Sequence, residues 1–330
     1  MKIGIIGAGG WGTAIACHLV RSGYSPIIWC YESDTSKEIN TLHTNSSFLP
    51  GVFLPNTLKA TSNIDDLNDC DLLINSTPTQ HIRPLVRRNR ELFANKQILN
   101  VSKGIEIGTM YRISQIFEDV ANIDMRNYAV LSGPSHAEEV ARQVPTALVV
   151  ASTNAAFADM IQQVFASPDF RVYSSFDVIG CELGGALKNV IALVAGILDG
   201  AGFGDNTKAA LITRGLSEIT KLGVAMGATY NTFYGLSGIG DLYVTCSSKF
   251  SRNRSVGERL GKGERLKDIV KGMKMIAEGV ETAKSAYELS KKHNIEMPIV
   301  TKVYQVIFRN FDLKQAINQL MTRESKRECL

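Results

Sequence analysis

A lysine inside an apolar segment is the residue of this sequence best suited to acid–base chemistry. Apart from Asn189, the other residues between positions 183 and 192 are apolar or small. At helical spacing the neighbours of Lys188 include Gly184 and Gly185, which would leave space beside its ammonium group. Burial lowers the pKa of a lysine toward neutrality, so Lys188 could give and take a proton in a ligand cavity. The alternative is a lysine that reaches solvent or lies at a close helix–helix contact.

Two further charged residues stand where loops would bring them to such a cavity. Lys103 lies two residues after an apolar run at residues 98–101, and Asp241 follows a glycine-rich stretch at residues 235–240. Ligands of an open parallel sheet lie beyond the carboxyl ends of its strands, which would put the Lys103 ammonium in that crevice. The carboxylate of Asp241 could orient a lysine by ion pairing, or could simply cap the next helix. A surface position for Lys103 is the alternative to a role in the crevice.

A short polar string suggests a place for an anion. Ser251, Arg252 and Asn253 open a helical stretch. Arginine and asparagine beside a helix N-terminus can form a cradle for an oxyanion or a phosphate. Such strings are also common on protein surfaces, so this one is informative only together with the residues above.

The first residues of the chain predict a dinucleotide site. An apolar run at residues 3–6 leads into Gly7, Gly9 and Gly12, with the spacing G-x-G-x-x-G, and an apolar helical pattern follows at once. These glycines allow a sharp turn, close approach of a pyrophosphate and close packing of the helix on the sheet. Glu32 lies past a second apolar run, where a carboxylate could bond a ribose 2′-hydroxyl and repel a 2′-phosphate, or could be an ordinary solvated charge. The choice between NAD and NADP therefore stays open, with a lean toward NAD.

The pattern along the chain predicts two domains. Short apolar runs alternate with helical stretches at residues 110–120 and 155–165, which is typical of a doubly wound α/β domain of the Rossmann type. Residues 33–60 hold a polar stretch and the loop SSFLPG at 46–51, which we expect to form a flap near the adenine side. After residue 180 the pattern is helical only. We therefore predict a Rossmann domain with a parallel sheet at residues 1–180 and an all-α domain at 181–330. The expected strands lie at residues 3–6, 26–31, 71–76, 98–101, 129–131, 146–151 and 170–173, and the later helices at 181–200, 207–228, 252–260, 280–292, 298–309 and 312–321.

Composition excludes several classes of function. The net charge of +4 in 330 residues is too small to indicate nucleic-acid or membrane binding, although it suits a small anionic ligand. Six scattered cysteines without C-x-x-C pairs indicate a reducing compartment, so we predict a cytoplasmic protein. No signal-peptide pattern opens the sequence, and the longest apolar run, at residues 190–198, is too short to span a bilayer. The five histidines show no ligand spacing, and we predict no metal.

Taken in order, these pieces resemble the bacterial type of NAD(P)-dependent glycerol-3-phosphate dehydrogenase. The resemblance extends over nearly the whole chain, and seven motifs in family order are far more specific than any one of them. The motifs are IGAGGWGTA (6–14), NVSKG (100–104), LSGPSHAEE (131–139), ELGGALKNVIALVAGI (182–197), GLSGIGDL (235–242), SRNRSVG (251–257) and EGVET (278–282).

The resemblance implies a role for each matching residue. Lys188 would be the proton donor and acceptor, with Lys103 and Asp241 beside it as catalytic residues. The implied substrate contacts are Lys103, Gly133, Ser135, Lys188, Asn189, Asp241, Thr245, Ser251, Arg252 and Asn253, with the substrate phosphate on Arg252 and Asn253. The implied cofactor contacts, besides Gly7, Gly9 and Gly12, are Gly10, Trp11, Tyr31, Lys103, Ala137, Arg252, Ile276 and Glu278.

Two residues depart from the pattern of this family. Serine is frequent in the family where Gly10 stands, which affects one hydrogen bond to a phosphate. Histidine or arginine is frequent where Tyr31 stands, which weakens any inference about a 2′-phosphate.

The implied reaction is reversible hydride transfer between NAD or NADP and dihydroxyacetone phosphate, giving sn-glycerol 3-phosphate for glycerophospholipid synthesis. A homodimer through the helical domain is implied as well. The alternatives are a dehydrogenase of the same layout that acts on another small anionic hydroxy or keto acid, and a dinucleotide sensor without catalysis. The intact lysines and aspartate argue against the sensor.

Overall fold

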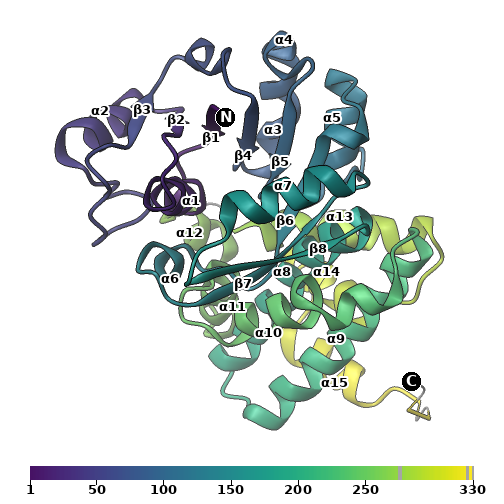
Figure 1. Cartoon of the computed structure of the whole chain (residues 1–330). Helices are drawn as coiled ribbons and strands as arrows, with labels where there is room; N and C mark the ends of the chain where they lie inside the picture. The colour runs from purple at the N-terminus through teal and green to yellow at the C-terminus, as the bar shows by residue number, and fades with distance from the viewer. Residues whose placement is uncertain (274–276, 325–326, 329–330) are drawn as a thin grey trace.

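The sheet and its helices form one part of the molecule, and a bundle of helices forms the other. In this computed structural model the structure describes residues 1–273, 277–324 and 327–328. Figure 1 shows the sheet with its flanking helices above and the helices from α8 onward below. The fold of the described residues is therefore the predicted one, an α/β region followed by a helical region.

One eight-stranded sheet organises the first part of the chain. Its strand order is β3-β2-β1-β4-β5-β6-β7-β8, and the first six strands follow the order of a Rossmann fold. The strands are β1 (Ile3–Ile6), β2 (Ile27–Trp29), β3 (Lys59–Thr61), β4 (Leu72–Asn75), β5 (Gln97–Asn100), β6 (Tyr128–Ser132), β7 (Thr146–Ala151) and β8 (Phe170–Ser175).

The sheet departs from the prediction in one pair. β7 runs antiparallel to β6, while the other neighbouring strands are parallel. The expectation of a wholly parallel sheet is therefore wrong at this pair. The short helix α6 (Ala137–Ala141) and a turn join β6 to β7. The link holds only this five-residue helix, whereas a right-handed crossover to a parallel strand usually contains a full helix, which favours the antiparallel arrangement.

Helices cover both faces of the sheet. The sequence predicted no helix or strand at residues 33–61, where α2 and β3 lie. The buried residues of α2 are Thr35, Ser36 and Ile39, so the helix lacks the apolar periodicity that would have predicted it. The helices of this region are α1 (Gly10–Arg21), α2 (Ser33–Leu42), α3 (Thr79–Arg88), α4 (Arg90–Phe93), α5 (Ile113–Ala121), α6 (Ala137–Ala141) and α7 (Ala155–Phe165).

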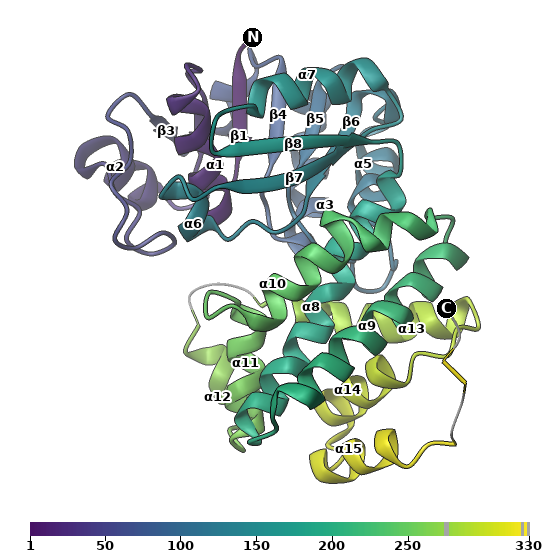
Figure 2. The same ribbon diagram turned by 60° about the horizontal axis from the view of Figure 1, so that its bottom comes forward.

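The second part of the chain is built around α8 (Val178–Gly200). Figure 2 shows this helix in the middle of the lower half, among α9, α10, α11 and α13. The other helices are α9 (Asp205–Ala225), α10 (Asp241–Ser247), α11 (Arg252–Gly261), α12 (Leu266–Lys271), α13 (Glu278–Lys292), α14 (Pro298–Arg309) and α15 (Leu313–Met321). The six predicted helices of this region are present, with ends shifted by up to three residues. Between residues 178 and 321, the described chain forms helices and turns without a strand.

The apolar composition of α8 serves the core. The helix is long and apolar enough to cross a membrane, so the expectation drawn from residues 190–198 alone understated its length. However, 83% of its most apolar window is buried inside the protein. Its apolar side chains pack in one cluster with those of α9, α13 and α14.

A buried carboxylate joins α8 to the sheet. One oxygen of Glu182 accepts hydrogen bonds from the Ser114 amide at 2.8 Å and from the Tyr128 hydroxyl at 2.7 Å. Its other oxygen accepts from Arg112 at 2.6 Å and from the Ser114 hydroxyl at 2.7 Å. Because a buried charge is stable only when its partners satisfy it, this network fixes the first turns of α8 against β6 and α5.

Candidate functional site

The turn between β1 and α1 has the geometry of a phosphate site. Gly7 has φ +108°, which a side chain would strain. A Cβ atom at Gly12 would lie 2.0 Å from the Gly7 carbonyl oxygen, so α1 can approach the strand only with glycine there. A Cβ atom at Gly9 would meet no protein atom within 4 Å, because this residue faces an open cavity. The N-terminus of the 12-residue helix α1 points toward the same space.

A single cavity connects this turn to Lys188. Its volume is about 960 Å³, and it runs along the carboxyl ends of the strands, between the sheet and the helical region. A dinucleotide needs an elongated cavity of this kind, with a phosphate site in its middle. The site residues predicted from the sequence that line the cavity are Gly7, Gly9, Gly10, Trp11, Tyr31, Lys103, Ser135, Lys188, Asn189, Thr245, Ser251, Arg252, Asn253 and Glu278.

Asp241 binds both lysines. One of its carboxylate oxygens accepts a hydrogen bond from the Lys188 ammonium, and the other accepts from Lys103 at 2.7 Å. Lys188 also donates to the Thr245 hydroxyl at 2.7 Å, and Lys103 to the Gly133 carbonyl at 3.0 Å. Asp241 is the first residue of α10, so it orients the lysines and is not the residue that caps this helix.

Burial makes Lys188 an acid–base group near neutral pH. Its side chain is 8% exposed, and this desolvation lowers the pKa of Lys188 to about 7. The carboxylate of Asp241 opposes the shift, while the neighbouring ammonium of Lys103 adds to it. A group with this pKa exchanges a proton readily at neutral pH.

The glycines near Lys188 do not open the space beside its ammonium group that the sequence predicted. A Cβ atom at Gly185 would lie 2.9 Å from the Ser132 hydroxyl and 3.3 Å from the stem of Lys103. At Gly184 it would lie 2.4 Å from the backbone oxygen of Ser237. The expectation that these glycines leave empty space is wrong, because they admit the side chain of Lys103 and the close approach of the 235–240 segment to α8.

The start of α11 supplies the polar wall opposite the sheet. The Ser251 hydroxyl accepts from the Arg254 amide at 3.2 Å and so caps the helix. Asn253 donates to Asn189 at 2.9 Å and accepts from the Gly279 amide at 2.9 Å. Arg252 lines the cavity and is exposed there, and desolvation by the nearby protein lowers the pKa of its guanidinium. The guanidinium stays charged at neutral pH and can bind a phosphate.

Glu278 closes the cavity from α13. One of its oxygens accepts from the Thr79 amide at the start of α3, at 3.0 Å. Burial raises the pKa of Glu278 to about 7, with the Thr79 hydrogen bond opposing the shift. The residue therefore links the helical region to the sheet at the edge of the site.

Four of the predicted residues that the structure describes do not line the cavity. Gly12 packs on the strand, Gly133 presents its carbonyl to Lys103, and Ala137 lies behind Gly10. Asp241 lies behind the lysines and is 1% exposed. Ile276 falls outside the described residues.

Sequence reasoning missed some residues of the cavity wall. His136 and Phe250 both line it, and their rings lie 5.8 Å apart. The LSGPSHAEE motif contains His136, but no spacing rule singled that residue out. Phe48 also lines the cavity, and Asn45 fixes its loop by donating to the Ala8 carbonyl at 2.8 Å. The predicted flap at residues 46–51 contains Phe48, but the sequence did not predict that this residue lies over the glycine turn.

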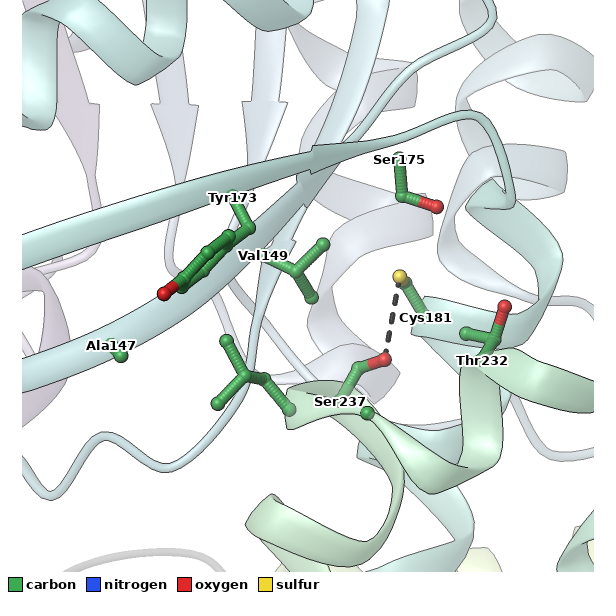
Figure 3. A pocket seen from close by; sticks show the side chains of 9 residues that line it. Ala147, Val149, Tyr173, Ser175, Cys181, Thr232 and Ser237 are labelled. Carbon is green, nitrogen blue, oxygen red and sulfur yellow. Dashed lines mark hydrogen bonds between the residues drawn. The ribbon is translucent and has the colours of Figure 1, made fainter.

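A second cavity of about 430 Å³ lies on the other side of the 235–240 segment. Figure 3 shows Tyr173 and Val149 on one side, and Cys181 and Ser237 on the other, joined by a hydrogen bond of 3.4 Å. The described residues that line it include no lysine, arginine or carboxylate. It therefore lacks the groups for acid–base chemistry that the larger cavity has.

Comparison with known proteins agrees with this geometry. Residues 2–158 match the family model for the N-terminus of NAD-dependent glycerol-3-phosphate dehydrogenase, and residues 177–318 match the model for its C-terminus. The chain is 46% identical to glycerol-3-phosphate dehydrogenase [NAD(P)+] of Pelotomaculum thermopropionicum, over 99% of this chain and 95% of that protein. The corresponding figures for the Geobacter sulfurreducens enzyme are 47%, 99% and 98%.

A solved structure agrees as well. The crystal structure of glycerol-3-phosphate dehydrogenase from Coxiella burnetii superposes with a TM-score of 0.93 at 36% identity, covering 98% of this chain and 99% of that one. The two family models match both halves of this chain, and the relatives match it over 99% of its length. The chain therefore belongs to the NAD(P)-dependent glycerol-3-phosphate dehydrogenase family of oxidoreductases.

Proposed function

We propose that this enzyme reduces dihydroxyacetone phosphate to sn-glycerol 3-phosphate, reversibly, with Lys188 as the proton donor. The observation that carries the proposal is the pair of lysines on Asp241 at one end of a dinucleotide-sized cavity. A carbonyl reduction develops negative charge on one oxygen. Two ammonium groups fixed by one carboxylate are suited to stabilise that charge.

The cofactor fits the other end of the cavity. The glycine turn leaves space at Gly9, where a side chain would occupy the path of a pyrophosphate. The free amides at the start of α1 would hold its phosphates, and Trp11 would form a wall of the site. When bound, the reduced nicotinamide supplies the hydride.

The two lysines would then have different roles at the substrate carbonyl. Lys103 polarises the C2 carbonyl oxygen, and Lys188 transfers a proton from its Nζ to that oxygen as the alkoxide develops. Asp241 holds both Nζ atoms in place and raises the proton affinity of Lys188. In the oxidative direction neutral Lys188 removes the proton from the C2 hydroxyl. Thr245 receives a hydrogen bond from Lys188 and limits its rotation.

The phosphate end of the substrate would bind at the start of α11. Arg252 and Asn253 lie there with Ser251 alongside, and Asn189 is hydrogen-bonded to Asn253. Ser135 and the Gly133 carbonyl stand beside Lys103. Binding energy from the phosphate would position the reacting carbon, which lies at the other end of the substrate.

The assay with dihydroxyacetone phosphate tests this proposal against the runner-up. Oxidation of NADH or NADPH by dihydroxyacetone phosphate is expected to exceed oxidation by other small anionic keto acids at equal concentration by orders of magnitude. A keto acid without phosphate that reacts faster would favour a different substrate. Stereochemical analysis of the product should give the sn-3 phosphate.

The proposal also covers the use of the product, the location of the protein, its oligomeric state and its domain boundary. We expect the product to enter glycerophospholipid synthesis, the protein to lie in the cytoplasm, and two chains to associate through the helical region. We place the domain boundary between residues 180 and 181, within the first turn of α8. The buried free thiols of Cys17, Cys30, Cys70, Cys181 and Cys246 support a reducing compartment.

A further inference from the structure

The end of the cavity far from the lysines is built by the loops after β2 and β3. The Gly7 amide donates to the Trp29 carbonyl at 3.1 Å, so the end of β2 lies directly beside the phosphate turn. The residues that follow this strand therefore lie next to the site predicted for the pyrophosphate. Those that line the cavity here are Trp29, Tyr31, Glu32, Ser62 and Asn63.

Two aromatic rings make this end suitable for a purine nucleoside. The ring of Tyr31 stands edge-on to Trp29, with centroids 6.2 Å apart, and Tyr31 is 79% exposed. The Trp29 indole donates a hydrogen bond to the Ser62 carbonyl at 3.2 Å, which fixes the orientation of the indole ring. An aromatic ring exposed at the rim of a cavity offers a stacking surface to a flat ligand such as an adenine.

The carboxylate of Glu32 has no protein partner in the part of the chain that the structure describes. Glu32 precedes α2 as its N-cap residue, but its side chain makes no capping hydrogen bond. No ion pair or side-chain hydrogen bond to another described residue holds it. A carboxylate beside an adenosine site can accept hydrogen bonds from the two ribose hydroxyls. It would instead repel a 2′-phosphate, which carries about two negative charges at neutral pH.

Two electrostatic contributions oppose that of Glu32. The N-terminus of α2 would attract a phosphate, but Glu32 and Asp34 already place two negative charges at that end. Arg88 lines the same cavity from the last turn of α3 and is the cation outside the reaction site that a 2′-phosphate would need. Lys103, Lys188 and Arg252 lie at the other end with the substrate.

We propose that Glu32 makes this enzyme select NAD(H) over NADP(H), and this inference rests on the proposed function. Glu32 acts by direct contact with the ribose of the cofactor. The selection would then distinguish this chain within a family whose members are named for both cofactors.

The test compares the two nucleotides in wild-type enzyme and in Glu32→Gln, with dihydroxyacetone phosphate as substrate. A charge-assisted hydrogen bond and a charge repulsion together predict a kcat/KM for NADH about 10- to 100-fold above that for NADPH in wild-type enzyme. Glu32→Gln should lower this ratio about tenfold, through a gain with NADPH as well as a loss with NADH. Arg88→Met should lower kcat/KM for NADPH more than kcat/KM for NADH.

Asp69→Asn is the matched control. Asp69 is an exposed carboxylate just before β4, at the amino ends of the strands and away from the cavity, where it pairs with Lys2 at 3.4 Å. Its loss should leave the nucleotide ratio unchanged. A wild-type preference for NADPH, or an unchanged ratio in Glu32→Gln, would overturn the inference.

Fluorescence titration of each reduced nucleotide separates this inference from the proposed function. Tighter binding of NADH than NADPH, lost in Glu32→Gln, supports the inference even if dihydroxyacetone phosphate is not reduced. Turnover of dihydroxyacetone phosphate with equal binding of both nucleotides would contradict the inference alone.

Discussion

Lys188 and Asp241 form a buried ion pair although 53 positions separate them in the chain. The carboxylate is 1% exposed and the lysine 8% exposed, so solvent screens the pair only weakly. The second oxygen of Asp241 holds Lys103 in the same way. The protonation state of Lys188 therefore depends on its burial and on these two charged neighbours.

The pH dependence of the reaction follows from the pKa of Lys188. Reduction needs the protonated lysine, so kcat/KM for dihydroxyacetone phosphate should fall by roughly tenfold per pH unit above about 7. Oxidation of glycerol 3-phosphate needs the neutral lysine and should fall as the pH drops below about 7. Initial rates in both directions from pH 5.5 to 9 check this; reduction that is constant up to pH 9 would contradict it.

Asp241→Asn should move that pH profile. The Asp241 carboxylate raises the pKa of Lys188 against the effect of burial, and its loss leaves two ammonium groups facing one another. The reductive limb should therefore shift toward acid pH, together with a fall in kcat of roughly 10²-fold or more. The pH profile of the variant measures the shift. An unchanged midpoint would show that Asp241 does not set the protonation of Lys188.

Arg252→Met should impair the use of the phosphate. We expect KM for dihydroxyacetone phosphate to rise about 10- to 100-fold, because a charge-assisted pair with the phosphate is lost. Dihydroxyacetone, which lacks the phosphate, provides the control: its low kcat/KM should be the same in both enzymes. Equal losses with both compounds would instead indicate a general disturbance of α11.

Two neighbouring glycines should respond differently to the same added methyl group. A Cβ atom at Gly10 would lie 2.6 Å from the Phe48 carbonyl oxygen, so Gly10→Ala should lower the free energy of unfolding by about 1–3 kcal/mol. Gly9→Ala adds its methyl group to open space and should leave the stability without cofactor unchanged while weakening NADH binding. Thermal unfolding with and without NADH measures both effects. Equal destabilisation by the two variants would contradict this distinction.

Local patterns could predict the elements of the site but not their pairing. The glycine turn is readable because its strand, turn and helix are adjacent in the chain. Lys188 is conspicuous because its apolar neighbours share its helix. The partner of Asp241 depends on how α10 packs against α8, and the choice between an ion pair and a helix cap could not be made from the sequence.

The missed elements have physical causes of the same kind. α2 has a mostly polar surface and buries few side chains, so its residues lack a helical period. The direction of β7 depends on the link through α6, and the apolar run at residues 146–151 carries no information about it. His136 enters the cavity wall because Phe250, far along the chain, packs near its ring.

Replacement of Lys188 by methionine tests the central claim most directly. Methionine keeps the apolar stem and removes the ammonium group. The account predicts that kcat for NADH oxidation by dihydroxyacetone phosphate falls roughly 10²- to 10⁴-fold, while NADH binding, followed by fluorescence, stays unchanged. Lys249→Met, which removes an ammonium group 5.5 Å from the Phe250 ring, is the control and should retain activity. Turnover at the wild-type rate in Lys188→Met would contradict the account.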